Sequence, residues 1–155
     1  MADDRADLLK VSTELPAAME TVLGRRDIIG EAARQFAPSR RYWAMVGNGP
    51  NRIAAQEVRV KLSELCYKSI AADSTEDKKH IDLSSEPLIF VCAAGLSGST
   101  ADDVAKEVAI FRAHKAAPIV VADEDQSRFS SALAVLLWRG RRDYVAKTGA
   151  RDGAS

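Results

Sequence analysis

Short apolar runs recur along the chain, separated by longer stretches in which apolar residues repeat at helical spacing. A short apolar run between turn signals is typical of a buried strand. Such runs predict strands at residues 42–46, 68–72, 87–93, 118–122 and 132–138. Because helical stretches alternate with them, we predict the α/β class: a three-layer αβα sandwich with a central parallel sheet of about five strands, of the flavodoxin or Rossmann type.

The two ends of the chain depart from this alternation. Residues 4–35 are rich in helix, with a new helix predicted to start at Leu15-Pro16 and a break between helices in the segment 24–27. The C-terminal end carries a short arginine cluster, which is typical of a solvated tail. We therefore divide the chain into a helical lead-in at 1–40, a single α/β domain at 41–138 and a basic, flexible tail at 139–155.

The composition fits one globular domain and excludes several kinds of partner. The chain has 155 residues and is 46% hydrophobic, which is enough to bury ~70% of its unfolded surface. Its 22 basic and 22 acidic side chains cancel, so we expect neither a nucleic-acid nor a membrane partner. No apolar run reaches the ~18–20 residues of a membrane span. The first residues are acidic rather than a positive leader, so we expect a cytoplasmic protein.

Cysteine placement argues against metal or thiol chemistry. Cys66 and Cys92 fall in predicted strand or strand-edge positions, where a reduced cysteine acts as a small core residue. Neither groups with a histidine at metal-ligand spacing. We expect no metal and no cofactor.

A glycine turn and the helix after it form the first candidate site. The predicted strand at 42–46 runs into Gly47-Asn48-Gly49, and Pro50 suits the first position of a helix. Within that helix the residues Val58, Leu62 and Leu65 form an apolar stripe expected to pack on the sheet. A parallel polar stripe contains Glu57, Lys61 and Glu64. On periodicity alone, a solvated face with a Glu-to-Lys pair worth ~0.2–0.5 kcal/mol explains the polar stripe.

A second candidate site follows the predicted strand at 87–93. The segment 95–102, Gly-Leu-Ser-Gly-Ser-Thr-Ala-Asp, leads into a helix that runs to about His114. Small and hydroxyl residues at a helix N-terminus favour anions, because free amide hydrogens and the positive end of the helix dipole point outward. An ordinary N-cap by Ser99 or Thr100 is the alternative explanation.

The segment from Gly47 to His80 resembles the sugar isomerase (SIS) family, most closely the second SIS repeat in the isomerase half of glucosamine-6-phosphate synthases. In that family a G-x-G turn leads into a helix ending in K-x-x-E-x-x-Y, and a G-E-x-K-H-G loop follows. Here the loop occupies residues 76–82 and lacks both family glycines. The resemblance implies that Lys61 is the family's lysine, Glu64 its isomerisation base and His80 its ring-opening histidine.

The second candidate site and the tail extend the resemblance. Residues 95–102 are similar to the S-x-S-G-x-T-x-D phosphate loop of SIS domains, with Gly95 at the position of the first serine. In the tail, Lys147 lies in a short segment similar to the lysine-bearing C-terminus of the synthases, and the resemblance makes it a further catalytic candidate. The substrate-binding residues implied are Gly47, Gly49, Ser97, Gly98, Ser99 and Thr100.

The resemblance implies a phosphosugar ligand such as fructose 6-phosphate and an aldose–ketose isomerisation. The chain starts Met1-Ala2 and has no cysteine before Cys66, so we expect no glutaminase domain, and only one SIS lobe is detected. Because SIS sites form between paired lobes, a homodimer or a partner lobe is implied. Two alternatives stay open: a non-catalytic module that senses a sugar phosphate, and a structural lobe of a larger assembly.

Overall fold

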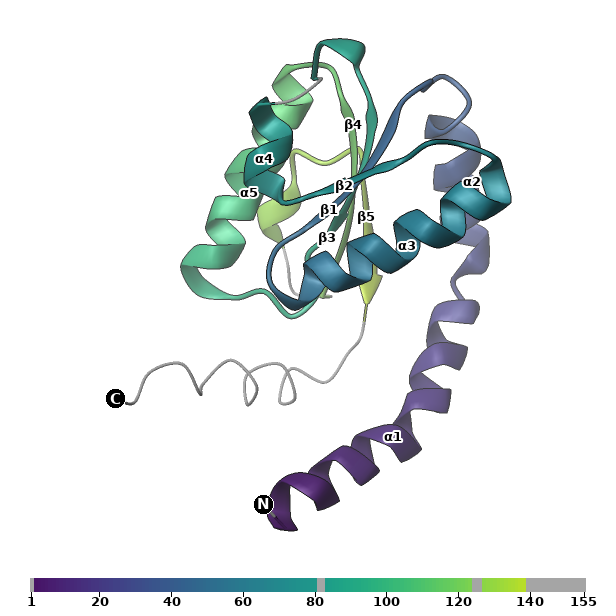
Figure 1. Ribbon diagram of the computed structural model, residues 1–155, viewed down its shortest axis with the longest axis vertical. Coiled ribbons are helices and arrows are strands. Elements are labelled where there is room, and N and C mark those ends of the chain that lie inside the picture. Colours follow the sequence, from purple (N-terminus) through teal and green to yellow (C-terminus); the bar gives the residue numbers. More distant parts are fainter. Residues whose placement is uncertain (1, 81–82, 124–126, 139–155) are drawn as a thin grey trace.

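The computed structural model describes residues 2–80, 83–123 and 127–138, which form a five-stranded sheet with helices on both faces (Figure 1). All four strand pairs are parallel, and the strand order is β2-β1-β3-β4-β5. The helices are α1 (Ala2–Leu23), α2 (Arg26–Phe36), α3 (Pro50–Cys66), α4 (Thr75–His80) and α5 (Gly98–Ala113), with short 3₁₀ turns η1 (Leu83–Ser85) and η2 (Ser127–Phe129). The strands are β1 (Trp43–Gly47), β2 (Ala71–Asp73), β3 (Leu88–Cys92), β4 (Ala117–Asp123) and β5 (Ala134–Trp138). The predicted α/β class and parallel sheet are confirmed.

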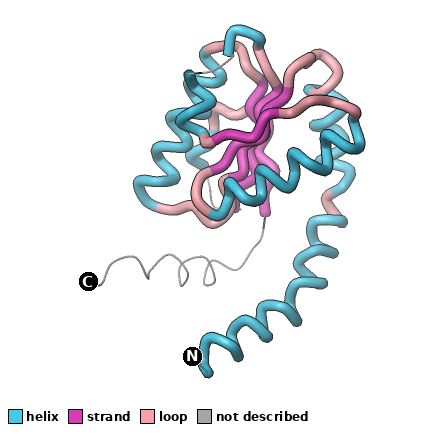
Figure 2. The backbone as a smooth tube through the Cα atoms, viewed as in Figure 1, coloured by secondary structure: helices cyan, strands magenta, loops and turns pink. Residues whose placement is uncertain are grey.

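The two faces of the sheet are covered by different helices. Figure 1 shows α2 and α3 on one face and α4 and α5 on the other, and Figure 2 shows the strands enclosed between these helices. Successive side chains of a strand point to opposite faces. In β1, Met45 joins the cluster under α3, whereas Val46 joins the cluster under α5. This alternation places a helix-covered core on each side of every central strand.

The sheet order contains one reversal of direction. From β1 the chain crosses to β2 at one edge, and it then returns to β3 on the other side of β1. In an open parallel sheet such a reversal leaves a crevice outside the carboxyl ends of the two strands concerned, where ligands bind. Here that position lies between the ends of β1 and β3.

The last turn of α3 corrects two predictions. A helix of 17 residues is about 25 Å long, whereas a five-residue strand such as β1 is about 16 Å long. The end of α3 therefore extends beyond the strand that it covers. Leu65, predicted to pack on the sheet, is 75% exposed, and Cys66, predicted to be a core residue near a strand, is the exposed last residue of the helix. Val58 and Leu62 do pack against the sheet as predicted, and Cys92 is buried in β3.

Two boundaries also differ from prediction. The short edge strand lies at Ala71–Asp73 rather than 68–72. No new helix starts at Leu15-Pro16, because α1 continues through Pro16 to Leu23. Proline removes one backbone donor but tolerates helical φ, so a single proline need not end a helix. The predicted break at 24–27 is confirmed by the turn between α1 and α2.

Candidate functional site at the carboxyl edge of the sheet

The turn between β1 and α3 requires both of its glycines. A Cβ atom on Gly47 would overlap the carbonyl of Asn51 in the first turn of α3. Gly49 has φ 54° and ψ −131°, a conformation open essentially to glycine alone. Pro50 then occupies the first helical position, as predicted. The backbone therefore turns sharply at the end of β1 without a side chain in the way.

The loop between β3 and α5 leaves its polar groups open to solvent. Ser97 is the N-cap residue and has an extended backbone, but no side chain caps the helix. Gly98 follows with φ 56°. The segment 97–100 is exposed, and the first amides of a helix have no acceptor within the helix. Because α5 begins at Gly98, Ser99 and Thr100 lie inside its first turn and the alternative N-cap by either residue is wrong. Their exposed hydroxyls stand beside amides that have no acceptor within the helix.

Hydrogen bonds tie the two loops to each other. Gly47 at the end of β1 lies in register with Cys92 at the end of β3. The side-chain amide of Asn51 donates to the carbonyl of Ala94 at 2.9 Å, and the Gly95 amide donates to the Asp123 carboxylate at 2.9 Å. Asp123 ends β4 and is buried. The ends of three adjacent strands thus form one connected edge.

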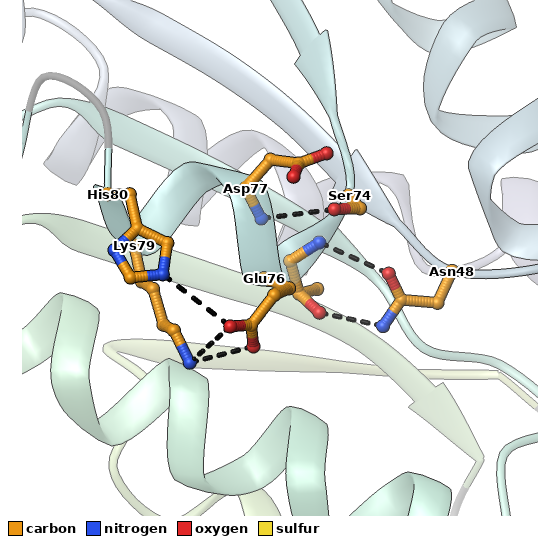
Figure 3. A network of polar contacts seen from close by, with 7 residues as sticks. Asn48, Ser74, Glu76, Asp77, Lys79 and His80 are labelled. Carbon is orange, nitrogen blue, oxygen red and sulfur yellow. Dashed lines mark hydrogen bonds and ion pairs between the residues drawn. The ribbon is translucent and has the colours of Figure 1, made fainter.

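The segment after β2 forms the helix α4 where the resemblance suggested a loop (Figure 3). The Ser74 hydroxyl accepts from the Asp77 amide at 3.0 Å and so caps the helix. Acidic residues occupy the first turn and basic residues the last, which suits the helix dipole. With neither family glycine present, nothing in this segment breaks the helix. His80 is therefore the last residue of α4.

A polar network joins α4 to the β1 turn. The side-chain amide nitrogen of Asn48 donates to the Thr75 hydroxyl at 2.7 Å. The side-chain carbonyl oxygen of Asn48 accepts from the Thr75 backbone amide at 3.2 Å (Figure 3). Next along α4, the Lys79 ammonium contacts the Glu76 carboxylate at 2.7 Å, and the His80 Nε2 lies 3.5 Å from the same group. Both Asn48 contacts fix the turn that follows β1.

Two glutamates on facing helices have opposite pKa shifts. The hydrogen bond from Lys79 lowers the pKa of Glu76 to about 2, and a further hydrogen bond involving Glu107 acts in the same direction. Glu107 on α5 is only 8% exposed, and burial raises its pKa. No described residue pairs with its Oε2 atom. The buried Glu107 with its raised pKa thus lies beside Glu76, whose pKa is lowered.

The structure brings Lys61 and Glu64 together on α3 but places His80 elsewhere in the same chain. Lys61 lies between Glu57 at 3.9 Å and Glu64 at 3.6 Å on the exposed side of α3. His80 is on α4, which packs against α5 across the sheet from α3 (Figure 1). Its side chain is 68% exposed. Lys147 lies outside the described residues.

Several polar residues of this edge escaped the sequence prediction. Asn48 and Asn51 carried a partial signal, because Asn48 lies in the predicted turn and Asn51 follows it, and Asp123 directly follows the strand predicted at 118–122. Thr75 and Glu107 carried no signal in the sequence, because their roles depend on the packing of α4 against α5. Within the described part of the chain, no group of three or more potential metal ligands occurs and no helix is long and apolar enough to cross a membrane.

Comparison with known proteins identifies the fold. No protein-family model and no curated protein sequence matches the chain. Among solved structures, the C-terminal domain of glucosamine-fructose-6-phosphate aminotransferase from Francisella tularensis superposes with a TM-score of 0.66 at 19% identity, over 88% of this chain and 40% of that one. The Vibrio vulnificus NanR protein complexed with ManNAc-6P superposes with a TM-score of 0.58 at 13% identity, over 94% of this chain and 60% of that one. The chain thus spans less than two thirds of either structure. It has the fold of a sugar isomerase (SIS) domain.

Proposed function

We propose that the chain binds a sugar phosphate in the crevice between the carboxyl ends of β1 and β3. The observation that carries this proposal is the coincidence of two loops with the reversal of the strand order. The Gly47–Gly49 turn follows one of the two strands at this point, and the hydroxyl loop at 97–100 follows the other. Parallel sheets bind ligands at this position.

The chemistry of the second loop suits a phosphate. The amides at the start of α5 that have no acceptor within the helix, three exposed hydroxyls and the positive end of the helix dipole all favour an oxyanion. Gly49 in the other loop would then lie against the sugar, since a Cβ atom there would meet nothing within 4 Å. The two similar structures, a glucosamine-fructose-6-phosphate aminotransferase domain and a NanR protein complexed with ManNAc-6P, support a ligand of this class.

We further propose that any isomerisation requires two lobes. In that reaction Glu64 would move a proton between C1 and C2, Lys61 would stabilise the developing oxyanion, and His80 would assist ring opening. α3, which carries Glu64, and α4, which carries His80, cover opposite faces of the sheet, so a single lobe would not present both residues to one sugar (Figure 1). A homodimer or a partner lobe would supply the missing group.

A sensing domain is the second candidate, and one observation favours it. Lys61 is held between Glu57 and Glu64 on an exposed helix face, as expected for a solvated ion-pair ladder. Binding at the loops does not need these residues. A sensor would therefore retain the phosphate site and lack turnover.

Calorimetry with fructose 6-phosphate and unphosphorylated fructose tests the binding proposal. We expect binding of the phosphate ester only. Thr100→Val should weaken that binding by ~1–3 kcal/mol, because one charge-assisted hydrogen bond is lost at an exposed residue.

Thr13→Val is the matched control for this experiment. Thr13 is an exposed residue of α1, and its hydroxyl donates only to the nearby Lys10 carbonyl at 2.7 Å. This variant should bind as the wild type does. Equal affinity of wild type and Thr100→Val would show that the hydroxyl loop does not bind the phosphate. Absence of binding to any hexose phosphate would favour a structural lobe.

A further inference from the structure

A single arginine reaches the hydroxyl loop from another element. Arg128 belongs to η2, which follows β4 and packs against α5 through the buried side chain of Phe129. Its Nε atom lies 3.2 Å from the Asp102 carboxylate, and its Nη1 atom donates to the Gly98 carbonyl at 3.5 Å. The guanidinium therefore lies beside the first turn of α5, and the neighbouring residue Phe129 packs into the core.

The position of this charge is unusual for a helix. The N-terminus of a helix carries partial positive charge, so a cation there is repelled and an anion is attracted. The first turn of α5 contains no acidic residue, and Asp102 at its fifth position is the carboxylate that Arg128 contacts. Both groups are partly exposed, so solvent screens their attraction. A further anion at the loop would offset the repulsion between the arginine and the helix end.

The Arg128 guanidinium also has N–H donors that its contacts with Asp102 and Gly98 do not use. A guanidinium carries five N–H donors in a fixed fork that matches phosphate oxygens. The contacts with Asp102 and Gly98 use one nitrogen each. The exposed hydroxyls of Ser97, Ser99 and Thr100 are near in sequence to the Gly98 carbonyl that Arg128 already contacts.

We propose that Arg128 is a phosphate ligand of the sugar-phosphate site and that it selects the doubly charged form of the phosphate. Asp102 holds the guanidinium beside the loop, and a phosphate would compete with Asp102 for it. This inference rests on the proposed binding function. It adds a residue from the β4–β5 connection to a site otherwise built after β1 and β3.

The test is calorimetric titration of fructose 6-phosphate into the full chain and its Arg128→Gln variant. We expect Kd to rise about tenfold to a hundredfold, because a charge-assisted contact to a dianion is lost. The wild type should also bind more weakly at pH 5 than at pH 7.5, since the second phosphate proton binds with a pKa of about 6. In Arg128→Gln that pH dependence should shrink. Arg112→Gln, at the opposite end of α5, is the matched control and should change neither the Kd nor its pH dependence.

A second pair of variants separates a ligand from a merely structural arginine. Asp102→Asn should tighten binding of fructose 6-phosphate, because the competing carboxylate is removed. In an Arg128→Gln background the same substitution should have a smaller effect, as expected for two coupled residues. A structural Arg128–Asp102 pair predicts instead that both single variants lower the melting temperature and leave the pH dependence of binding unchanged.

The outcomes distinguish this inference from the function on which it rests. Wild-type binding with an unchanged Kd in Arg128→Gln overturns the role of Arg128 and leaves the binding function in place. Absence of wild-type binding overturns both. A selective loss in Arg128→Gln, with normal behaviour of Arg112→Gln, supports both.

Discussion

The carboxyl-edge loops and the polar stripe of α3 are the two parts of the proposed site, and they are built in different ways. The loops are fixed by two obligatory glycines and by hydrogen bonds from Asn51 and to Asp123. The stripe of Glu57, Lys61 and Glu64 stands on an exposed helix face, and its members contact one another. We propose that the first region binds the ligand within one chain, and that the second would gain a catalytic environment only when another surface covers it.

The largest expected effect concerns the stripe. If Glu64 is the proton-transferring base of an active two-lobe assembly, Glu64→Gln should reduce turnover of fructose 6-phosphate by ~10²–10⁴-fold while binding persists. Incorporation of solvent deuterium at C2 measures the proton transfer directly. Glu57→Gln, on the same exposed face, should retain activity.

Equal behaviour of these two variants would contradict a catalytic role for Glu64. A wild type that binds hexose phosphates but exchanges no proton would favour the sensing domain. Either result would sharpen the contrast, since the loops would then be the whole functional site.

The next effect concerns the glycine turn. Gly47→Ala places a methyl group against the Asn51 carbonyl, and relieving that overlap requires a backbone shift. We expect a loss of ~1–3 kcal/mol in the free energy of unfolding, measured by urea denaturation. Gly24→Ala is the control, because its added Cβ meets its nearest neighbour, the Thr21 carbonyl oxygen, at an ordinary 3.4 Å. If both variants were equally stable, the β1 turn would not be tightly built.

A smaller effect is expected where the two loops are joined. Asn51→Ala removes the 2.9 Å hydrogen bond to the Ala94 carbonyl. This should cost ~1 kcal/mol of stability and also weaken binding of fructose 6-phosphate, because the two loops lose a direct link. Gln56→Ala, at an exposed position of the same helix, should alter neither. Normal ligand affinity in Asn51→Ala would show that the loops bind independently.

The smallest effect is a pH dependence at the α4–α5 contact. Burial raises the pKa of Glu107 above its ordinary value of 4.5, so its contribution to stability is full below pH 4.5 and is lost as pH rises through the folded-state pKa. Glu107→Gln should therefore raise the melting temperature more at pH 7 than at pH 4.5. Glu57→Gln serves as the exposed control. A melting-temperature difference that does not vary with pH would mean that the pKa of Glu107 is not raised in the folded protein.

Local signals in the sequence located most of the fold. The glycines before Pro50 marked the start of α3, and apolar runs marked all five strands, because turn chemistry and strand burial depend on neighbouring residues. The same local rules failed at Leu65 and Cys66. Their exposure depends on the length of α3 relative to the strand beneath it, which periodicity does not encode.

The sequence by itself determined the local parts of this protein: the glycine turn after one strand, the hydroxyl loop after another, and the helices that follow them. Only the tertiary structure decided how these parts meet. Strand order put the β1 and β3 loops on either side of the chain reversal and sent α3 and α4 to opposite faces, which separates Glu64 from His80. It also brought Arg128 to the first turn of α5 and buried Glu107 against α4. These are contacts between residues far apart in sequence, and they arise from the packing of whole elements, which no local pattern of residues specifies.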